Sequence, residues 1–156
     1  MIDINTMVTQ AKVARQNKIN AYKAAKNHLQ EDIDQISDQQ IETILKPAIN
    51  KIVNQVYLYN DSDSDRFVDK STYINFQEVL KKLLSPASLQ DYYHATAELT
   101  ELHCAPKISQ TKQSNYTEII QLFVKRFTKY ANDYKLPVKF DATETKLEVT
   151  IDFNSL

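Results

Sequence analysis

Glycine is missing from all 156 residues of the chain. An average sequence contains roughly 7% glycine, so about eleven would be expected at this length. Glycine is the default residue where the backbone must take a positive φ or approach a ligand closely. Phosphate-binding loops, dinucleotide-binding turns and the nucleophile elbow of serine hydrolases therefore have no sequence basis here. This absence favours a protein that is not an enzyme and that binds no cofactor.

Cysteine is nearly absent as well. Cys104 is the only one, so no disulfide can form within the chain, which fits a reducing compartment. Long apolar runs are also lacking: no stretch approaches the length of a membrane span, and the first 30 residues have no signal-peptide core. These absences predict a soluble, cytoplasmic protein with no membrane association.

What is present is an ordinary globular composition. The chain is 42% apolar and 25% charged, with a formal net charge of −1. This charge argues against a surface built entirely for nucleic acid or anionic lipid. The length suits one domain with a core of its own, so we expect a single domain over residues 1–156.

Residues 1–36 are predicted to form one long, polar helix. Its apolar residues recur at helical spacing on one face, but alanines fill much of that face and cations interrupt it. The apolar residues are Ile4, Val8, Ala11, Ile19, Tyr22, Leu29, Ile33 and Ile36. A stripe this thin predicts a helix that projects from the body, lies across it, or packs on a partner.

Residues 37–134 are predicted to form a helical body of four further helices. Ser37 precedes Gln40 by three residues, the capping-box spacing, and Asn75 precedes Glu78 in the same way. Residues 56–59 either end the second helix or form a short strand. The later helices are expected to open at Ser88 and at Asn115. The last one carries a stripe predicted to be core: Tyr116, Ile119, Ile120, Phe123, Phe127, Tyr130 and Tyr134.

The hydrophobic period changes near the C-terminus. Between residues 136 and 154, apolar residues alternate with polar ones, as in half-buried strands, and residues 141–145 would connect two such strands. An isolated hairpin is marginally stable in water, so it should pack on the helices. The predicted fold class is α+β, predominantly α: about five helices with a C-terminal antiparallel β-hairpin packed on them.

Basic residues gather in the N-terminal helix, where Asp3 is the only acidic residue among the first thirty. These cations are the predicted partner-binding residues: Lys12, Arg15, Lys18, Lys23 and Lys26. Such a stripe is able to follow phosphates, which keeps nucleic-acid binding as an alternative. Acidic residues follow directly at Glu31 and Asp32, so a helix face that is solvated or meets an acidic protein is the preferred interpretation.

Two weak metal-site candidates remain. Asp61, Asp63 and Asp65 alternate like the first half of an EF-hand loop, but Arg66 and Thr72 stand where that loop needs glycine and glutamate. A solvated acidic loop is the preferred interpretation, with no metal bound.

His94 and Glu98 lie four residues apart and so share one helix face. They allow a second alternative, a metal-assisted hydrolase, which would need a third ligand nearby. A surface contact between the two side chains is the simpler interpretation.

The sequence thus favours a non-catalytic protein–protein interaction or assembly protein that binds a protein partner or forms a homo-oligomer. The bias towards lysine, asparagine, isoleucine and tyrosine suggests an AT-rich coding sequence. We therefore expect a small accessory, structural or host-directed protein of a phage or mobile element, located in a host cytoplasm or in a virion.

Overall fold

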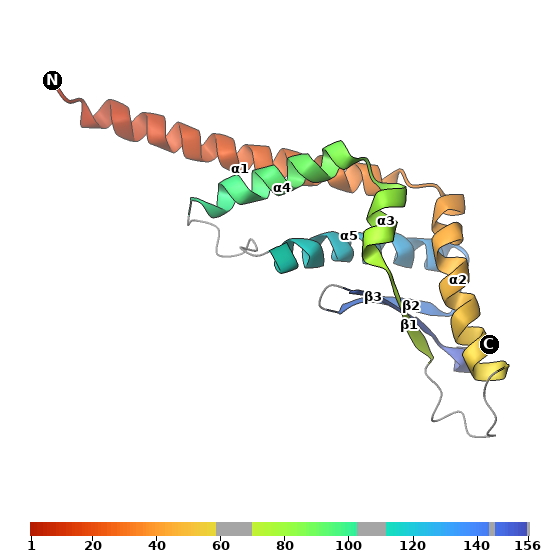
Figure 1. The fold of residues 1–156 in the computed structure, drawn as a ribbon. Helices are drawn as coiled ribbons and strands as arrows, with labels where there is room; N and C mark the ends of the chain where they lie inside the picture. The colour runs from red at the N-terminus through yellow and green to blue at the C-terminus, as the bar shows by residue number, and fades with distance from the viewer. Residues whose placement is uncertain (59–69, 103–111, 144–145, 156) are drawn as a thin grey trace.

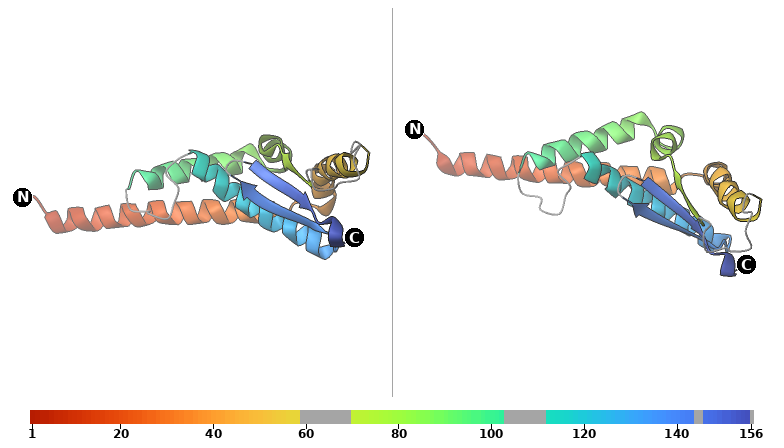
Figure 2. Two further views of the ribbon diagram at one scale, coloured as in Figure 1. Left: turned by 90° about the horizontal axis from the view of Figure 1, so that it is seen from below. Right: turned by 60° about the horizontal axis from the view of Figure 1, so that its bottom comes forward.

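The computed structural model describes the chain except for residues 59–69, 103–111, 144–145 and 156. The described residues form five α-helices, three β-strands and one short 3-10 helix, in the order α1, α2, β1, α3, α4, α5, β2, β3 and η2 (Phe153–Ser155). The predicted class, α+β and predominantly α, is confirmed (Figure 1). Helix α5 lies along one face of the small sheet, and α1 extends well beyond the other elements (Figures 1 and 2).

Helix α1 (Ile4–Asp34) begins at a side-chain cap. Asp3 Oδ1 accepts a hydrogen bond from Thr6 N at 3.1 Å, which satisfies one of the unpaired amides of the first turn. Only three residues of its 31 are buried, and all three lie in its second half: Tyr22, Leu29 and Ile33. The helix is therefore anchored to the body by its C-terminal half.

Helix α2 (Asp38–Tyr57) opens with the predicted capping box. Ser37 Oγ accepts from Gln40 N at 3.2 Å, and Gln40 Oε1 accepts from Ser37 N at 3.1 Å. Four apolar residues on one face are buried, namely Ile41, Leu45, Ile52 and Val56. The helix ends at Tyr57, so residues 56–57 belong to a helix end rather than to a strand.

Helices α3 (Phe76–Leu83) and α4 (Pro86–Thr100) are capped by Asn75 and Ser85. The predicted start of α4 at Ser88 is wrong. Proline needs no amide partner in the first turn, so Pro86 opens the helix instead of delaying it. Ser88 is buried and donates a hydrogen bond to Asp32 Oδ2 of α1.

Helix α5 (Lys112–Asp133) starts before the predicted Asn115 and carries most of the predicted core stripe. Ile119, Ile120, Phe123 and Phe127 are fully buried, and Tyr130 nearly so. Tyr134 is half exposed because it lies beyond the helix end. There Lys135 takes φ 54°, the left-handed position that glycine usually fills, and Leu136 N donates to Ala131 O at 2.8 Å.

The predicted C-terminal hairpin is present as β2 (Val138–Thr143) and β3 (Lys146–Ile151). A third strand that the sequence did not predict, β1 (Ser71–Ile74), pairs antiparallel with β3, giving the order β1-β3-β2. Leu147, Val149 and Ile151 are buried on the face that packs on the helices. The opposite face carries polar side chains, as antiparallel sheets allow.

A group of polar contacts connects the C-terminal half of α5 and Tyr134 to the turn between α1 and α2. Arg126 of α5 is buried, and its Nη2 donates to Ile36 O at 2.6 Å and to Asp38 Oδ1 at 3.1 Å. Tyr134 Oη donates to Asp38 Oδ2 at 2.8 Å. These bonds fix the point from which α1 departs and so set the direction of the projecting helix.

Candidate binding surface on the first helix

The exposure of α1 changes abruptly along its length. Every residue from Ile4 to Asn17 is exposed, and we call this segment the arm. Its apolar side chains face water: Ile4 is 68% exposed, Met7 60% and Val8 45%. Leu29 and Ile33, further along the same helix, are almost completely buried. The arm therefore exposes its apolar side chains, whereas the rest of α1 buries them.

The uncovered and the covered residues belong to one stripe, which Arg15 and Lys18 interrupt. At 3.6 residues per turn, Ile4, Val8 and Ala11 lie on the same side of α1 as Tyr22 and Leu29. Among the described residues, α4 and α5 pack on the covered part of the stripe, and α4 is too short to reach the arm. Ser88 at the start of α4 lies against Asp32, whereas Glu98 near its end already lies against Lys18. The arm therefore extends past the end of α4 (Figure 1).

An open groove runs along the seam between α1 and α4, and we call it the α1–α4 groove. Its volume is about 430 Å³. Four alanines line it together with five charged or histidine side chains: Ala21, Ala24, Ala25, Ala95, Lys18, His28, Asp91, His94 and Glu98. Because alanines project so little, another helix could approach closely here.

The five predicted partner-binding cations fall into two groups. Lys18 Nζ lies 3.8 Å from Glu98 Oε2, and Lys26 Nζ lies 2.7 Å from Glu118 Oε1, so both contribute to contacts within the chain. Lys12, Arg15 and Lys23 are exposed. The charge that a partner would meet on α1 thus comes mainly from these three residues.

A carboxylate cluster anchors the second half of α1. Glu118 of α5 accepts hydrogen bonds from Tyr22 Oη at 2.8 Å and from Tyr92 Oη, besides its ion pair with Lys26. Burial alone would raise the pKa of Glu118, but the donors Lys26, Tyr92 and Tyr22 outweigh burial and lower it. Burial and the nearby carboxylate raise the pKa of both tyrosines. The cluster joins α1, α4 and α5 around one negative charge.

The metal-site candidates gain no support. Asp61, Asp63 and Asp65 lie outside the described residues. His94 and Glu98 do share a face, with Nε2 3.5 Å from Oε1, but the His94 side chain is 79% exposed. Among the residues that the structure describes, no three His, Cys, Asp or Glu side chains come close enough to hold a metal ion. His94 and Glu98 instead form one rim of the α1–α4 groove.

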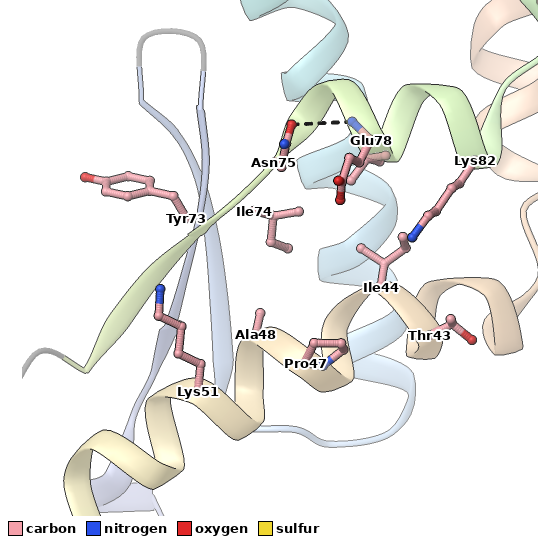
Figure 3. A pocket seen from close by; sticks show the side chains of 11 residues that line it. Thr43, Ile44, Pro47, Ala48, Lys51, Tyr73, Ile74, Asn75, Glu78 and Lys82 are labelled. Carbon is pink, nitrogen blue, oxygen red and sulfur yellow. Dashed lines mark hydrogen bonds between the residues drawn. The ribbon is translucent and has the colours of Figure 1, made fainter. Parts of the chain in front are cut away.

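A second, smaller pocket lies between α2, β1 and α3 (Figure 3). Its volume is about 260 Å³, and Ile44, Pro47 and Ile74 contribute apolar surface. Lys51 and Lys82 lie at opposite ends of the pocket in Figure 3. Asn75, also in its lining, caps α3 through Glu78 N at 3.4 Å. The polar groups of this pocket are spread out and do not converge on one point.

No protein family model matches the chain, and no curated protein or solved structure matches it. No described helix combines the length and the apolar character that crossing a membrane requires. The function must therefore be inferred from the residues and surfaces of the chain itself.

The sequence indicated the arm by its thin apolar stripe but gave no sign of the α1–α4 groove. The groove joins residues some 70 positions apart, such as Ala21 and Asp91, and only the antiparallel packing of α1 and α4 brings them together.

Proposed function

We propose that the chain is a non-catalytic protein–protein interaction or assembly protein whose binding surface is the uncovered side of α1. The observation that carries this proposal is the apolar stripe of α1, whose residues are buried at Tyr22, Leu29 and Ile33 and open to water over the arm. Contiguous exposed apolar surface of this kind marks interaction sites in folded proteins. The occupant we propose is a helix of a protein, since helices meet amphipathic helices along such stripes.

The cations of the arm fit this role in a second way. Arg15 lies within the apolar stripe and Lys12 lies beside it, so a protein helix with carboxylates on or beside its apolar face would match both features. A nucleic acid would match the cations alone and would leave Ile4 and Met7 in water. The exposed apolar residues therefore favour a protein partner over the nucleic-acid alternative.

The biological setting that we propose follows from composition. The AT-rich bias suits an accessory, structural or host-directed protein of a phage or mobile element, working in a host cytoplasm or in a virion. The proposal includes no catalytic role and no cofactor.

Site-specific photo-crosslinking in the host cell tests the proposal. A photoreactive p-benzoylphenylalanine replaces Met7 on the apolar stripe or, as the matched control, Gln16 on the opposite side of the same helix. We expect protein adducts from position 7, few from position 16, and loss of the adducts when Ile4→Asp is added. Adducts to nucleic acid, or equal labelling from both positions, would contradict the proposed protein-binding role.

A further inference from the structure

We infer that the occupant of the α1 surface is α1 of a second copy of this chain, packed antiparallel so that each arm lies in the partner's α1–α4 groove. This inference rests on the proposed function and names the partner. It is carried by the complementary shapes and charges of the arm and the groove, which are two parts of one molecule.

The shapes of the two parts are complementary. The arm presents two large apolar side chains, Ile4 and Met7, that are mostly in water. The groove presents the small side chains Ala21, Ala24 and Ala25 of α1 and Ala95 of α4. Large residues opposite small ones let two helices interdigitate at short axial distance. The arm therefore supplies the large apolar side chains that the groove lacks. In an isologous dimer, each copy's arm would fill the other copy's groove.

The spacing along α1 supports the same arrangement. Eight positions alternate three and four residues apart, the period of a helix that packs along a partner helix: Ile4, Met7, Ala11, Ala14, Lys18, Ala21, Ala25 and His28. All eight are at least partly exposed. The first four belong to the arm, and the last four line the groove. One face of α1 thus contains both halves of the interface.

An antiparallel pairing with its two-fold axis near position 16 matches these halves residue by residue. Met7 of one copy then faces Ala25 of the other, and Ala11 faces Ala21. The contact would extend over residues 4–28 of both chains, roughly 36 Å of helix. Ile4, Met7 and Ala11 of each arm would rest on the partner's α1 and α4, as the stripe beyond Tyr22 rests on α4 of its own chain.

The charges favour the antiparallel direction over the parallel one. Between Ile4 and Asn17 the arm carries Lys12 and Arg15 and no acidic residue, a formal charge of +2. The groove carries Asp91 and Glu98 against Lys18, a formal charge of −1 with its histidines neutral. Antiparallel packing brings the cationic arm alongside the anionic groove, with Lys12 and Arg15 outside the eight packing positions, whereas parallel packing places arm beside arm. Lys18, which lies near the axis, is already paired with Glu98.

Sedimentation equilibrium of the full chain is the first test. We expect twice the chain mass, and we expect Ala21→Arg to weaken dimerisation roughly tenfold or more because it fills the groove. Met7→Glu should have a similar effect from the arm side, where Met7 is 60% exposed. Gln16→Arg, on the opposite side of α1, should leave the dimer intact. A wild-type chain that stays monomeric, or a dimer unaffected by Ala21→Arg and Met7→Glu, would overturn the inference.

Cysteine pairing tests the direction of packing, with Cys104 replaced by serine. A chain carrying Ala11→Cys is mixed with one carrying Ala21→Cys under mild copper–phenanthroline oxidation. The mixed disulfide should exceed either homodimeric disulfide, and Gln16→Cys should give none. A dominant Ala11→Cys homodisulfide would indicate parallel packing and refute the proposed arrangement.

The two proposals fail in distinguishable ways. If the chain is monomeric but photo-crosslinks from position 7 to a different protein, the self-association is wrong and the protein-binding role stands. If position 7 crosslinks to no protein while the chain is monomeric, both are wrong.

Discussion

Glu118 is the residue that ties the projecting helix to the body. Its carboxylate accepts from Tyr22, Tyr92 and Lys26, which come from α1 and α4. Hydrogen bonds to a charged group are stronger than neutral ones, and partners left unpaired in a semi-buried site are costly. The orientation of α1 therefore depends on the charge of Glu118, which lies on α5 and not on α1 itself.

Glu118→Gln should lower the free energy of unfolding by about 1–3 kcal/mol, because the three donors lose a charged acceptor. Chemical denaturation at pH 7 measures this loss. Glu31→Gln on the exposed side of α1 is the matched control and should change little. Equal stability of both variants would show that the cluster contributes nothing.

The effect of Glu118→Gln on stability should also depend on pH. The pKa of Glu118 is lower in the folded protein than in the unfolded chain, so its contribution is present above the unfolded pKa and lost as pH falls through the folded one. The stability difference between wild type and Glu118→Gln should therefore shrink below about pH 4. A difference that stays constant from pH 7 to pH 3 would contradict the lowered pKa.

The role of Glu118 could not be predicted from the sequence. Glu118 is 96 residues from Tyr22 and 92 from Lys26, and no local pattern links positions so far apart. The cations of α1 were predicted as one group, yet Lys18 and Lys26 form intramolecular ion pairs. Only the packing of α1 on α4 and α5 separates them from Lys12, Arg15 and Lys23.

At the scale of an element, α1 behaves as two different helices joined end to end. Its second half is stabilised by burial, as most helices in proteins are, while the arm depends on local propensity and its Asp3 cap. The same side of the helix is core at Leu29 and surface at Val8.

Shortening one apolar side chain in each half of α1 should therefore change the unfolding free energy by very different amounts. Leu29→Ala removes a fully buried side chain and should cost about 2–5 kcal/mol of unfolding free energy. Val8→Ala, on the same face of the same helix, should leave the unfolding free energy of the monomer nearly unchanged. Denaturation at a concentration low enough to keep the chain monomeric measures both. A large loss from Val8→Ala would show that the arm packs on its own body.

The start of α2 makes a second prediction at this scale. Ser37→Ala removes the side-chain acceptor for Gln40 N and should cost about 0.5–2 kcal/mol in thermal or chemical unfolding. Ser37→Asp should retain most of the stability because aspartate also caps helices. If both variants are equally destabilised, the capping bond is not the cause.

The elements that the sequence predicted best are those with local signals. The caps at Ser37 and Asn75 and the alternation in β2 and β3 are each encoded within a few residues. Strand β1 has only four residues, too few to show alternation, and it exists because β3 offers an edge to pair with. Helix α4 starts at Pro86 and not at the predicted Ser88, because proline is favoured in the first turn of a helix.

At the scale of the whole molecule, the structure is a compact body with one long helix leaving it (Figure 2). The body has a continuous core that includes residues of all five helices and of the sheet. The arm contributes no residue to that core. The body therefore provides the stability of the fold, and the arm is left for the proposed binding.

Deleting residues 1–16 should therefore leave the body folded. We expect an unchanged near-ultraviolet circular dichroism spectrum and a melting temperature equal to that of the full-length monomer, together with loss of self-association. Deleting into the anchored half, through residue 30, should unfold the protein because Tyr22 and Leu29 are lost. A body that cannot fold without residues 1–16 would contradict this division.

Hydrogen–deuterium exchange of the full chain at two protein concentrations tests the central claim most directly, namely that the uncovered side of α1 is covered by α1 of a second copy. Amides of residues 4–17 should exchange quickly in dilute solution and become protected as concentration rises, while those of residues 22–34 stay protected throughout. If exchange in the arm is equally fast at every concentration, the uncovered stripe is not covered by a second copy and the account fails at that point.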